Sequence, residues 1–364
     1  MIKSDRKRRQ LGLVAGFILF GVTVGAIYGA AITLILIGLT LEALLLGLLR
    51  GIITGGLIGG IIGGFELFYA SAPVGQPFRK LPFRWVLTWR VLIYAFTIVT
   101  CDKLGELLVP IDNSQPVALN LATLVTLVIS LLFSFAVNFM FWIAQTLGPG
   151  VLPSFLGGRY HQPRQETRLF LFIDIRGSSA IAERIGDLDF LRLLNLFMTD
   201  IGDVVHRFGG RVHKYVGDEV IATWTKPDHD GTQDTKNNLA GKSGWAEGAL
   251  HAVFAARDRL AEQATLYHRQ FGLVPEFRAV LHAGPVVVGE MGEIKREIAL
   301  LGDTINSTAK LEQLAKAQPY DIVASQAALD AIGDLGGIDI QPLGPQAIPG
   351  KRQEIVTYAI RGRI

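Results

Sequence analysis

The sequence predicts a protein in two parts: an N-terminal bundle of four membrane-spanning helices, then an α+β domain of ferredoxin-like type. Two observations support this fold class. Long apolar runs fill residues 11–146, whereas charged and polar residues occur at ordinary globular density from residue 162 onward. The second half then shows strand, helix, hairpin, helix and strand patterns in that order, which is the ferredoxin-like order.

Four apolar segments are each long enough to cross a bilayer, which takes about 20 residues. Residues 11–37 carry no charge and are too long for the core of a signal peptide. Further spans are expected at about 45–69, 83–101 and 117–146, and the last of these is again uncharged. The membrane domain is therefore expected to occupy residues 1–146.

Basic residues near the span ends predict the orientation, because loops rich in Lys and Arg stay in the cytoplasm. Residues 3–9 contain five of them and residues 79–90 contain four, whereas residues 102–116 contain only Lys103. We therefore expect a multi-pass protein of the cell membrane, with its N-terminus and its C-terminal domain in the cytoplasm.

The expected second span repeats glycine every four residues, at Gly51, Gly55, Gly59 and Gly63, and again at Gly56, Gly60 and Gly64. Such ridges let a neighbouring helix approach closely, either inside one bundle or across a dimer. Glu66, near the inner end of this span, is interpreted either as a ligand or ion sensor or as the partner of a neighbouring arginine.

Composition excludes several functions. A net charge of +3, with no basic patch interleaved with aromatic residues, argues against nucleic acid as a partner. The single cysteine, Cys101, excludes an intrachain disulfide and a cysteine-based zinc site. The four spans lack the paired interrupted segments of a transporter.

A linker is expected over residues 147–168, because four glycines and three prolines between 147 and 164 break helices. The following domain is expected to cover residues 169–364. Strands are predicted at 169–173, 211–215, 219–224, 276–283, 286–288 and 296–301, and long helices at 181–208 and 245–271. Residues 226–244 are predicted to form a surface loop.

Two aspartates stand where this domain could bind metal and phosphate. Asp174 ends the first strand, and Gly177 and Ser178 then lead into a helix whose N-terminus would face an anion. Asp218 lies at the tip of the predicted hairpin. Two carboxylates of one sheet can hold two divalent ions for an in-line displacement at phosphorus. Taken singly, Asp174 is more typical of a helix N-cap and Asp218 of a turn.

Three motifs resemble those of the class III adenylyl and guanylyl cyclases. Residues 172–178 (FIDIRGS) are similar to the first metal motif, 214–222 (KYVGDEVIA) to the second, and 302–312 (GDTINSTAKLE) to the third. Their order and spacing, over about residues 165–361, identify the C-terminal half as a class III cyclase domain.

The resemblance implies a head-to-tail homodimer with two sites at its interface. One protomer would hold two Mg²⁺ or Mn²⁺ ions through Asp174, Ile175 and Asp218. These ions would favour the ribose 3′-oxygen of the nucleotide as an alkoxide, which attacks the α-phosphorus and expels pyrophosphate. Gly177 and Ser178 would lie against the phosphates.

The partner protomer would supply the remaining groups. The resemblance implies that Lys214 reads adenine, Asn306 orients the ribose, Lys310 faces the α-phosphate and Lys351 binds the triphosphate. Residues 306 and 310, four apart, would share one helical face. Asp303 is expected to cap that helix.

Lys214 predicts ATP as the substrate, because lysine only donates hydrogen bonds and N1 of adenine accepts one. Two positions depart from the family pattern. Ala299 stands where a base-contacting Asp or Thr is usual, which weakens discrimination against GTP. Lys310 replaces the usual arginine and loses its two-pronged geometry, which predicts reduced turnover.

The sequence therefore predicts a membrane-bound adenylyl cyclase that makes cyclic AMP from ATP. Two alternatives stay open: a guanylyl or relaxed-specificity cyclase, and a degenerate cyclase domain acting as a nucleotide-binding regulator. The second of these is disfavoured because both metal-binding carboxylates, Asp174 and Asp218, are present.

Overall fold

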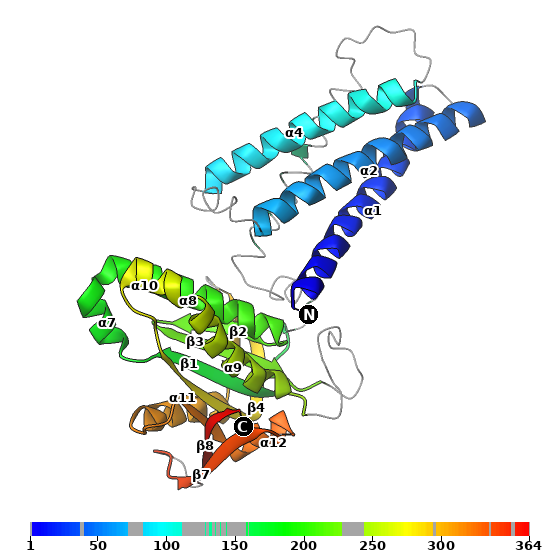
Figure 1. Ribbon diagram of the computed structural model, residues 1–364. Helices are drawn as coiled ribbons and strands as arrows, with labels where there is room; N and C mark the ends of the chain where they lie inside the picture. The colour runs from blue at the N-terminus through cyan, green and yellow to red at the C-terminus, as the bar shows by residue number, and fades with distance from the viewer. Residues whose placement is uncertain are drawn as a thin grey trace. The chain divides into compact units, whose positions relative to one another are not determined.

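The computed structural model describes residues 2–36, 40–71, 83–110, 158, 160–227, 244–293, 296–334, 336–350 and 354–363, and six positions between 128 and 143. Most of the expected fourth span and Lys351 lie outside the described residues. The chain divides into two compact units, Met1–Thr146 and Leu147–Ile364 (Figure 1). Each unit is described by itself.

Most of the described residues of the first unit belong to three long helices: α1 (Ile2–Leu36), α2 (Leu41–Ser71) and α4 (Phe83–Leu108). Two stretches, Val14–Leu34 and Leu41–Glu66, are long and apolar enough to cross a membrane. They correspond to the first two expected spans. The described residues therefore provide two apolar helices of spanning length, rather than the expected bundle of four.

Helices α1 and α2 pack backbone against backbone through glycines. A side chain added at Gly21 or Gly25 of α1 would strike the carbonyl oxygen of Gly55 or Gly51 on α2, and the reverse also holds. The first glycine ridge of α2, which includes Gly51, Gly55 and Gly59, thus contacts α1 of the same chain. The second ridge is looser, since Gly64 has no atom within 4 Å of an added side chain.

Polar side chains join α2 to α4. Arg90 donates a hydrogen bond to Glu66 at 3.0 Å, and the Tyr94 hydroxyl donates to the other oxygen of the same carboxylate. Farther along the same two helices, the guanidinium of Arg50 on α2 lies 3.5 Å from a carboxylate oxygen of Asp102 on α4. Of the two interpretations of Glu66, pairing with a neighbouring arginine is the one that these contacts favour.

The second unit is built on one sheet with strand order β2-β3-β1-β4-β6-β8-β7, and β5 pairs with β4. Its first part contains β1 (Arg164–Ile175), α7 (Ser178–Ile185), α8 (Asp187–Arg207), β2 (Arg211–Val216), β3 (Glu219–Thr225), α9 (Glu247–Glu262), α10 (Ala264–Phe271) and β4 (Phe277–Met291). The antiparallel order β2-β3-β1-β4 is that of a ferredoxin-like fold, which confirms the predicted class.

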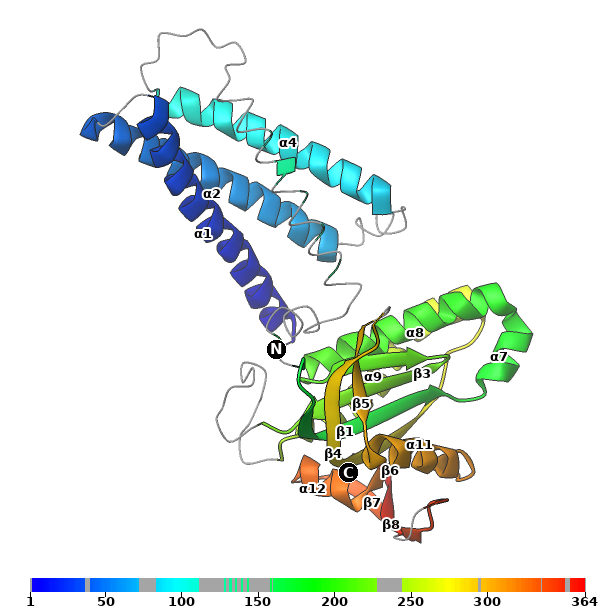
Figure 2. The ribbon, with the colours of Figure 1, turned by 180° about the vertical axis from the view of Figure 1, so that it is seen from behind.

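The remaining elements extend this core: β5 (Glu297–Leu301), α11 (Asp303–Lys316), β6 (Ile322–Ser325), α12 (Gln326–Ile332), β7 (Ile338–Gln346) and β8 (Ile355–Arg363). Strand β6 runs parallel to β4, whereas β8 is antiparallel to both β6 and β7. Helices α8 and α9 cover one face of the sheet, and α11 covers the other (Figure 2).

Alternation along β1 determines which face each side chain meets. Leu169, Leu171 and Ile173 belong to the core shared with α8 and α9. Phe170 and Phe172 belong to a second cluster, against which Ile305 and Ala309 of α11 pack. Asp174 continues the even-numbered series. Its side chain is therefore directed to the face that α11 covers.

Several predicted boundaries were wrong. The helix expected over 181–208 is interrupted at Gly186, whose φ of 81° is not helical, and the helix expected over 245–271 is interrupted at Gln263. The strands expected at 276–283 and 286–288 form one strand, because Gly284 and Pro285 stay in register with β1. Strand β1 begins at Arg164, inside the expected linker.

The capping prediction for α11 was also wrong. Gly302 occupies the N-cap position, with a φ of 145°, and Asp303 is the first residue of the helix. An acidic side chain in the first turn still interacts favourably with the helix dipole.

Candidate active site

The two candidate metal-binding aspartates lie at one end of the sheet. Asp174 is next to last in β1, and in the antiparallel register it stands opposite Glu219, the first residue of β3. Gly217, with a φ of 62°, allows the tight turn that places Asp218 between β2 and β3. The hairpin therefore brings Asp218 and Glu219 beside Asp174.

Helix α11 adds a carboxylate and an ammonium to this group. Lys316 Nζ lies 2.9 Å from Asp174 Oδ2 and 2.8 Å from Glu312 Oε1. The side chains of Asp174 and Glu312 are only 10% and 11% exposed. We call Asp174, Asp218, Glu219, Glu312 and Lys316 the carboxylate cluster.

The electrostatics of the cluster reflect its burial and its excess of negative charge. Burial raises the pKa of Asp174 to about 6; Lys316 opposes the rise and the Asp218 carboxylate adds to it. Burial, together with the nearby Glu312 and Asp174, raises the pKa of Glu219 to about 7. Burial disfavours the charged form of Lys316, but its contacts with Glu312 and Asp174 outweigh this and raise its pKa.

The cluster fits a divalent cation that is shared with a substrate. In the part of the chain that the structure describes, no three His, Cys, Asp or Glu side chains form a complete metal cage. Mg²⁺ does not need one, because it is usually bound by one or two carboxylates together with substrate phosphates and waters. Glu219 Oε1 is buried without a hydrogen-bond partner, and the cluster holds four carboxylates to one ammonium, so negative charge is in excess. Asp174 and Asp218 therefore suit such an ion, with Ile175 next to them at the end of β1.

The expected phosphate-facing helix start lies beside this cluster. Gly177, with a φ of 67°, is the N-cap of α7, and Ser178 is its first residue. Both follow Asp174 within four residues. The free N–H groups of this helix end suit an anion next to a metal-binding carboxylate.

The predicted base-reading residue lies in a different part of the sheet. Lys214 of β2 approaches Glu297 of β5, with Nζ 3.9 Å from Oε1. Ala299 is two residues farther along β5, so it shares a face with Glu297. The structure thus supplies a carboxylate near Lys214 although Ala299 itself offers no polar side chain.

Asn306 and Lys310 lie on α11, and Asn306 is exposed. Lys310 Nζ donates to the carbonyl oxygen of Pro349 at 2.5 Å. This contact places Lys310 beside the loop that continues into Lys351, which is outside the described residues.

Within one chain, then, the predicted residues that the structure describes lie in three places. Asp174, Ile175, Gly177, Ser178 and Asp218 gather at the sheet end, whereas Lys214 pairs with β5 and Lys310 with the 349–350 loop. The sequence prediction assigned no role to Glu219, Glu312 or Lys316. The local signals were the Asp-Glu pair at the hairpin tip and the four-residue spacing of Glu312 and Lys316.

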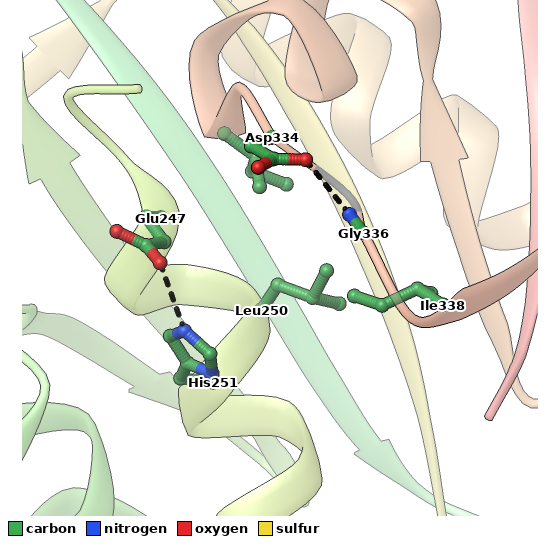
Figure 3. A pocket seen from close by; sticks show the side chains of 7 residues that line it. Glu247, Leu250, His251, Asp334, Gly336 and Ile338 are labelled. Atoms are coloured by element: carbon green, nitrogen blue, oxygen red, sulfur yellow. Dashed lines mark hydrogen bonds and ion pairs between the residues drawn. The ribbon is translucent and has the colours of Figure 1, made fainter. Parts of the chain in front are cut away.

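A small hollow lies apart from the carboxylate cluster, between α9 and the segment from α12 to β7 (Figure 3). Its volume is about 160 Å³. The Glu247 carboxylate bonds to the His251 ring at 3.2 Å, and Asp334 accepts from the Gly336 amide at 2.9 Å. Because these polar groups bond to their own neighbours along the chain, the hollow suggests no chemistry of its own.

The sequence matches the family described as "Adenylate and Guanylate cyclase catalytic domain" over residues 160–362. The chain belongs to the class III nucleotidyl cyclases. The match covers the described sheet of the second unit except for its last residue, and it includes the carboxylate cluster. The resemblance of the three motifs to this cyclase family is thereby confirmed.

Relatives of this cyclase include Adenylate cyclase 2 of Rhizobium meliloti (strain 1021), 32% identical over 240 residues, which are 66% of this chain and 62% of that protein. Adenylate cyclase 1 of the same organism is 28% identical over 216 residues, 58% of this chain and 30% of that protein. The chain thus spans less than two thirds of either relative. A bacterial light-regulated adenylyl cyclase has the same fold, with a TM-score of 0.52 at 18% identity over 69% of this chain and 72% of that one.

Proposed function

We propose that the chain is a membrane-bound adenylyl cyclase that converts ATP to 3′,5′-cyclic AMP and pyrophosphate. The observation that carries this proposal is the carboxylate cluster at the end of a cyclase-family sheet, in which Asp174 and Asp218 stand side by side. The two relatives named adenylate cyclases support the same reaction.

Asp174, Asp218 and Ile175 are the residues proposed to hold two Mg²⁺ or Mn²⁺ ions. When bound, such ions neutralise the phosphate charge and favour ionisation of the ribose 3′-hydroxyl. The first turn of α7 presents backbone N–H groups to the phosphates. Lys214 donates a hydrogen bond to N1 of adenine, because its ammonium has donors only.

Asn306 is proposed to orient the ribose by hydrogen bonds from its amide. Lys310 faces the charge that develops on the α-phosphate, where a positioned cation stabilises the transition state. A lysine ammonium is a point charge and cannot donate two parallel hydrogen bonds to a phosphate as a guanidinium does. Turnover is therefore expected to be lower than with arginine.

A head-to-tail homodimer is proposed because the cyclase domain exposes apolar side chains on the edge strand that carries Lys214 and on the β4–β5 pair. They include Tyr215 and Val216 of β2, Val287 and Met291 of β4, and Leu301 of β5, each more than 40% exposed. A second copy of the chain that covers these side chains would remove their apolar surface from water. A second copy covering them would bring Asn306 and Lys310 to the partner's carboxylates.

The membrane topology is proposed as four spans with both chain ends in the cytoplasm. The two apolar helices of spanning length and the basic residues of 3–9 and 79–90 support it. Reporter fusions test it: alkaline phosphatase inserted after residue 110 is expected to be active, and the same enzyme at the C-terminus inactive. Activity at the C-terminus would contradict the topology.

The deciding experiment measures product formation by the purified full-length chain with Mn²⁺ or Mg²⁺, offering ATP and GTP separately. The control is Asp174→Asn, which keeps the shape of the side chain and removes its charge. Cyclic AMP that falls at least about 100-fold in the control would support the enzyme and its metal site. No product from either nucleotide, with nucleotide binding retained, would favour the regulator instead.

A relaxed-specificity cyclase is the second candidate, because Ala299 is 8% exposed and cannot hydrogen-bond a base through its side chain. It predicts cyclic GMP from GTP at a rate comparable to that of cyclic AMP from ATP in the same assay. A preference of more than about 100-fold for ATP would exclude it.

A further inference from the structure

Lys316 occupies the place where a metal ion would approach Asp174. Its ammonium is 2.9 Å from Asp174 Oδ2, on a side chain that is 10% exposed. Among the described residues, this is the one ion pair that Asp174 makes. Lys316 is the last residue of α11, and it reaches Asp174 because that side chain is directed to the face of the sheet that α11 covers.

We propose that Lys316 is a tethered competitor of the divalent cation at Asp174. Its ammonium neutralises the buried carboxylate before a metal arrives and has to withdraw for the metal to bind. This inference rests on the proposed metal site. Mg²⁺ binds carboxylate oxygen at about 2.0–2.1 Å, so an ammonium in contact with the same oxygen would be adjacent to a divalent ion and strongly repelled.

The structure also contains the place to which Lys316 withdraws. Its Nζ lies 2.8 Å from Glu312 Oε1, one helical turn earlier on α11. The Lys316 side chain is 44% exposed, so it can rotate toward solvent without disturbing the core, while Glu312 is held at 11% exposure. Lys316 therefore exchanges two carboxylate partners for one when Asp174 is taken by a metal.

This exchange would set a threshold for metal binding. A free ion must displace the ammonium with only carboxylates as its ligands. A metal that arrives on the triphosphate of ATP gains phosphate ligands as well, so it overcomes the same competition more easily. Lys316 would thus favour entry of the metal–nucleotide complex over entry of the free ion.

The test measures Mn²⁺ binding directly, by electron paramagnetic resonance of free Mn²⁺, to the full-length protein in detergent without nucleotide. Lys316→Gln removes the competing charge, and its Kd for Mn²⁺ is expected to fall at least about fivefold. The matched control is Lys226→Gln, the same substitution at an exposed lysine after β3, and its Kd should equal that of the wild type. An unchanged or weaker affinity in folded Lys316→Gln overturns the proposal.

A second variant acts in the opposite direction and keeps the proposal testable if Lys316→Gln does not fold. Glu312→Gln weakens the alternative partner, so Lys316 stays on Asp174 and the Kd for Mn²⁺ is expected to rise at least about threefold. An unchanged or lower Kd contradicts the proposal. The melting temperature without metal provides a further readout, because it should fall in Lys316→Gln and recover when Mn²⁺ is added.

Asp174→Asn separates failure of this inference from failure of the proposed function. If the wild type binds Mn²⁺, Asp174→Asn abolishes binding and Lys316→Gln changes nothing, only the competition is refuted. If neither the wild type nor Lys316→Gln binds Mn²⁺, the metal site itself is refuted and the inference with it.

Discussion

Glu219 is expected to destabilise the metal-free protein above neutral pH, and Glu219→Gln should remove this effect. Its carboxylate is partly buried among Asp174, Asp218 and Glu312, and Oε1 has no hydrogen-bond partner. Glutamine keeps the shape of the side chain, removes the charge and adds N–H donors for the neighbouring carboxylates. The variant should therefore be more stable than the wild type when no metal is bound.

The size and pH dependence follow from the pKa of Glu219, which is raised from 4.5 to about 7. A raised carboxyl pKa means that the folded state binds the proton more tightly than the unfolded state. The stabilisation that protonated Glu219 contributes is thus fully present below pH 4.5 and is lost as the pH rises through 7. At about 1.4 kcal/mol per pKa unit the loss approaches roughly 3 kcal/mol, which solvent screening of a partly exposed group reduces to about 1–2 kcal/mol.

Thermal melts of the purified full-length protein in detergent with EDTA, followed by tryptophan fluorescence, would measure this. Glu219→Gln is expected to melt about 2 to 8 °C above the wild type at pH 8. At pH 4, below the ordinary pKa of 4.5, the two proteins are expected to melt at the same temperature. Saturating Mn²⁺ should reduce the difference. Glu262→Gln, at a glutamate that is 71% exposed, is the matched control and should not shift the melt. A lower melting temperature at pH 8, or the same gain at both pH values, would refute the reasoning.

Three further changes have defined expectations. Gly55→Leu should lower the melting temperature of the detergent-solubilised protein by several degrees, because the new side chain meets the backbone of α1, whereas Gly64→Leu should be tolerated; equal effects would contradict the packing. Burial lowers the pKa of His213 to about 4, so protonation opposes folding and stability should fall by up to roughly 3 kcal/mol as the pH drops from 6.5 to 4. His213→Asn should flatten that profile in urea titrations, and a parallel profile would count against it. Glu297→Ala should reduce the ratio of kcat/KM for ATP over GTP about tenfold, since it removes the carboxylate near Lys214 that can accept from the amino group of adenine; an unchanged ratio would exclude that role.

The order of strands and helices along the first part of the cyclase domain could be predicted because its signals are local. The apolar run before Asp174 and the Gly217-Asp218 turn lie within a few residues of the structures they specify. The interruptions at Gly186 and Gln263 could not be predicted in the same way, because apolar periodicity continues across both positions. Helix α7 packs against α8, and α10 packs against α8 and α9. Sequence periodicity does not contain these contacts.

The same distinction between local and long-range signals applies to the residues of the candidate site. Asp174 and Asp218 could be predicted because each stands beside glycine in a recognisable turn or helix start. Lys316 could not, because its contact with Asp174 depends on where the end of α11 crosses the sheet. Glu297 near Lys214 likewise requires β5 to fold back along β4, a pairing between strands that no local pattern specifies.

The glycine contact between α1 and α2 also limits how the membrane half can move. Where two backbones touch, neither helix can rotate or slide without losing contact along its whole length. Helix α4 is joined to α2 through longer side chains, such as those of Glu66 and Arg90, whose rotamers can change while their charges stay paired. Rearrangement among these three helices is therefore expected to leave the α1–α2 hairpin rigid and to take place at the α2–α4 boundary.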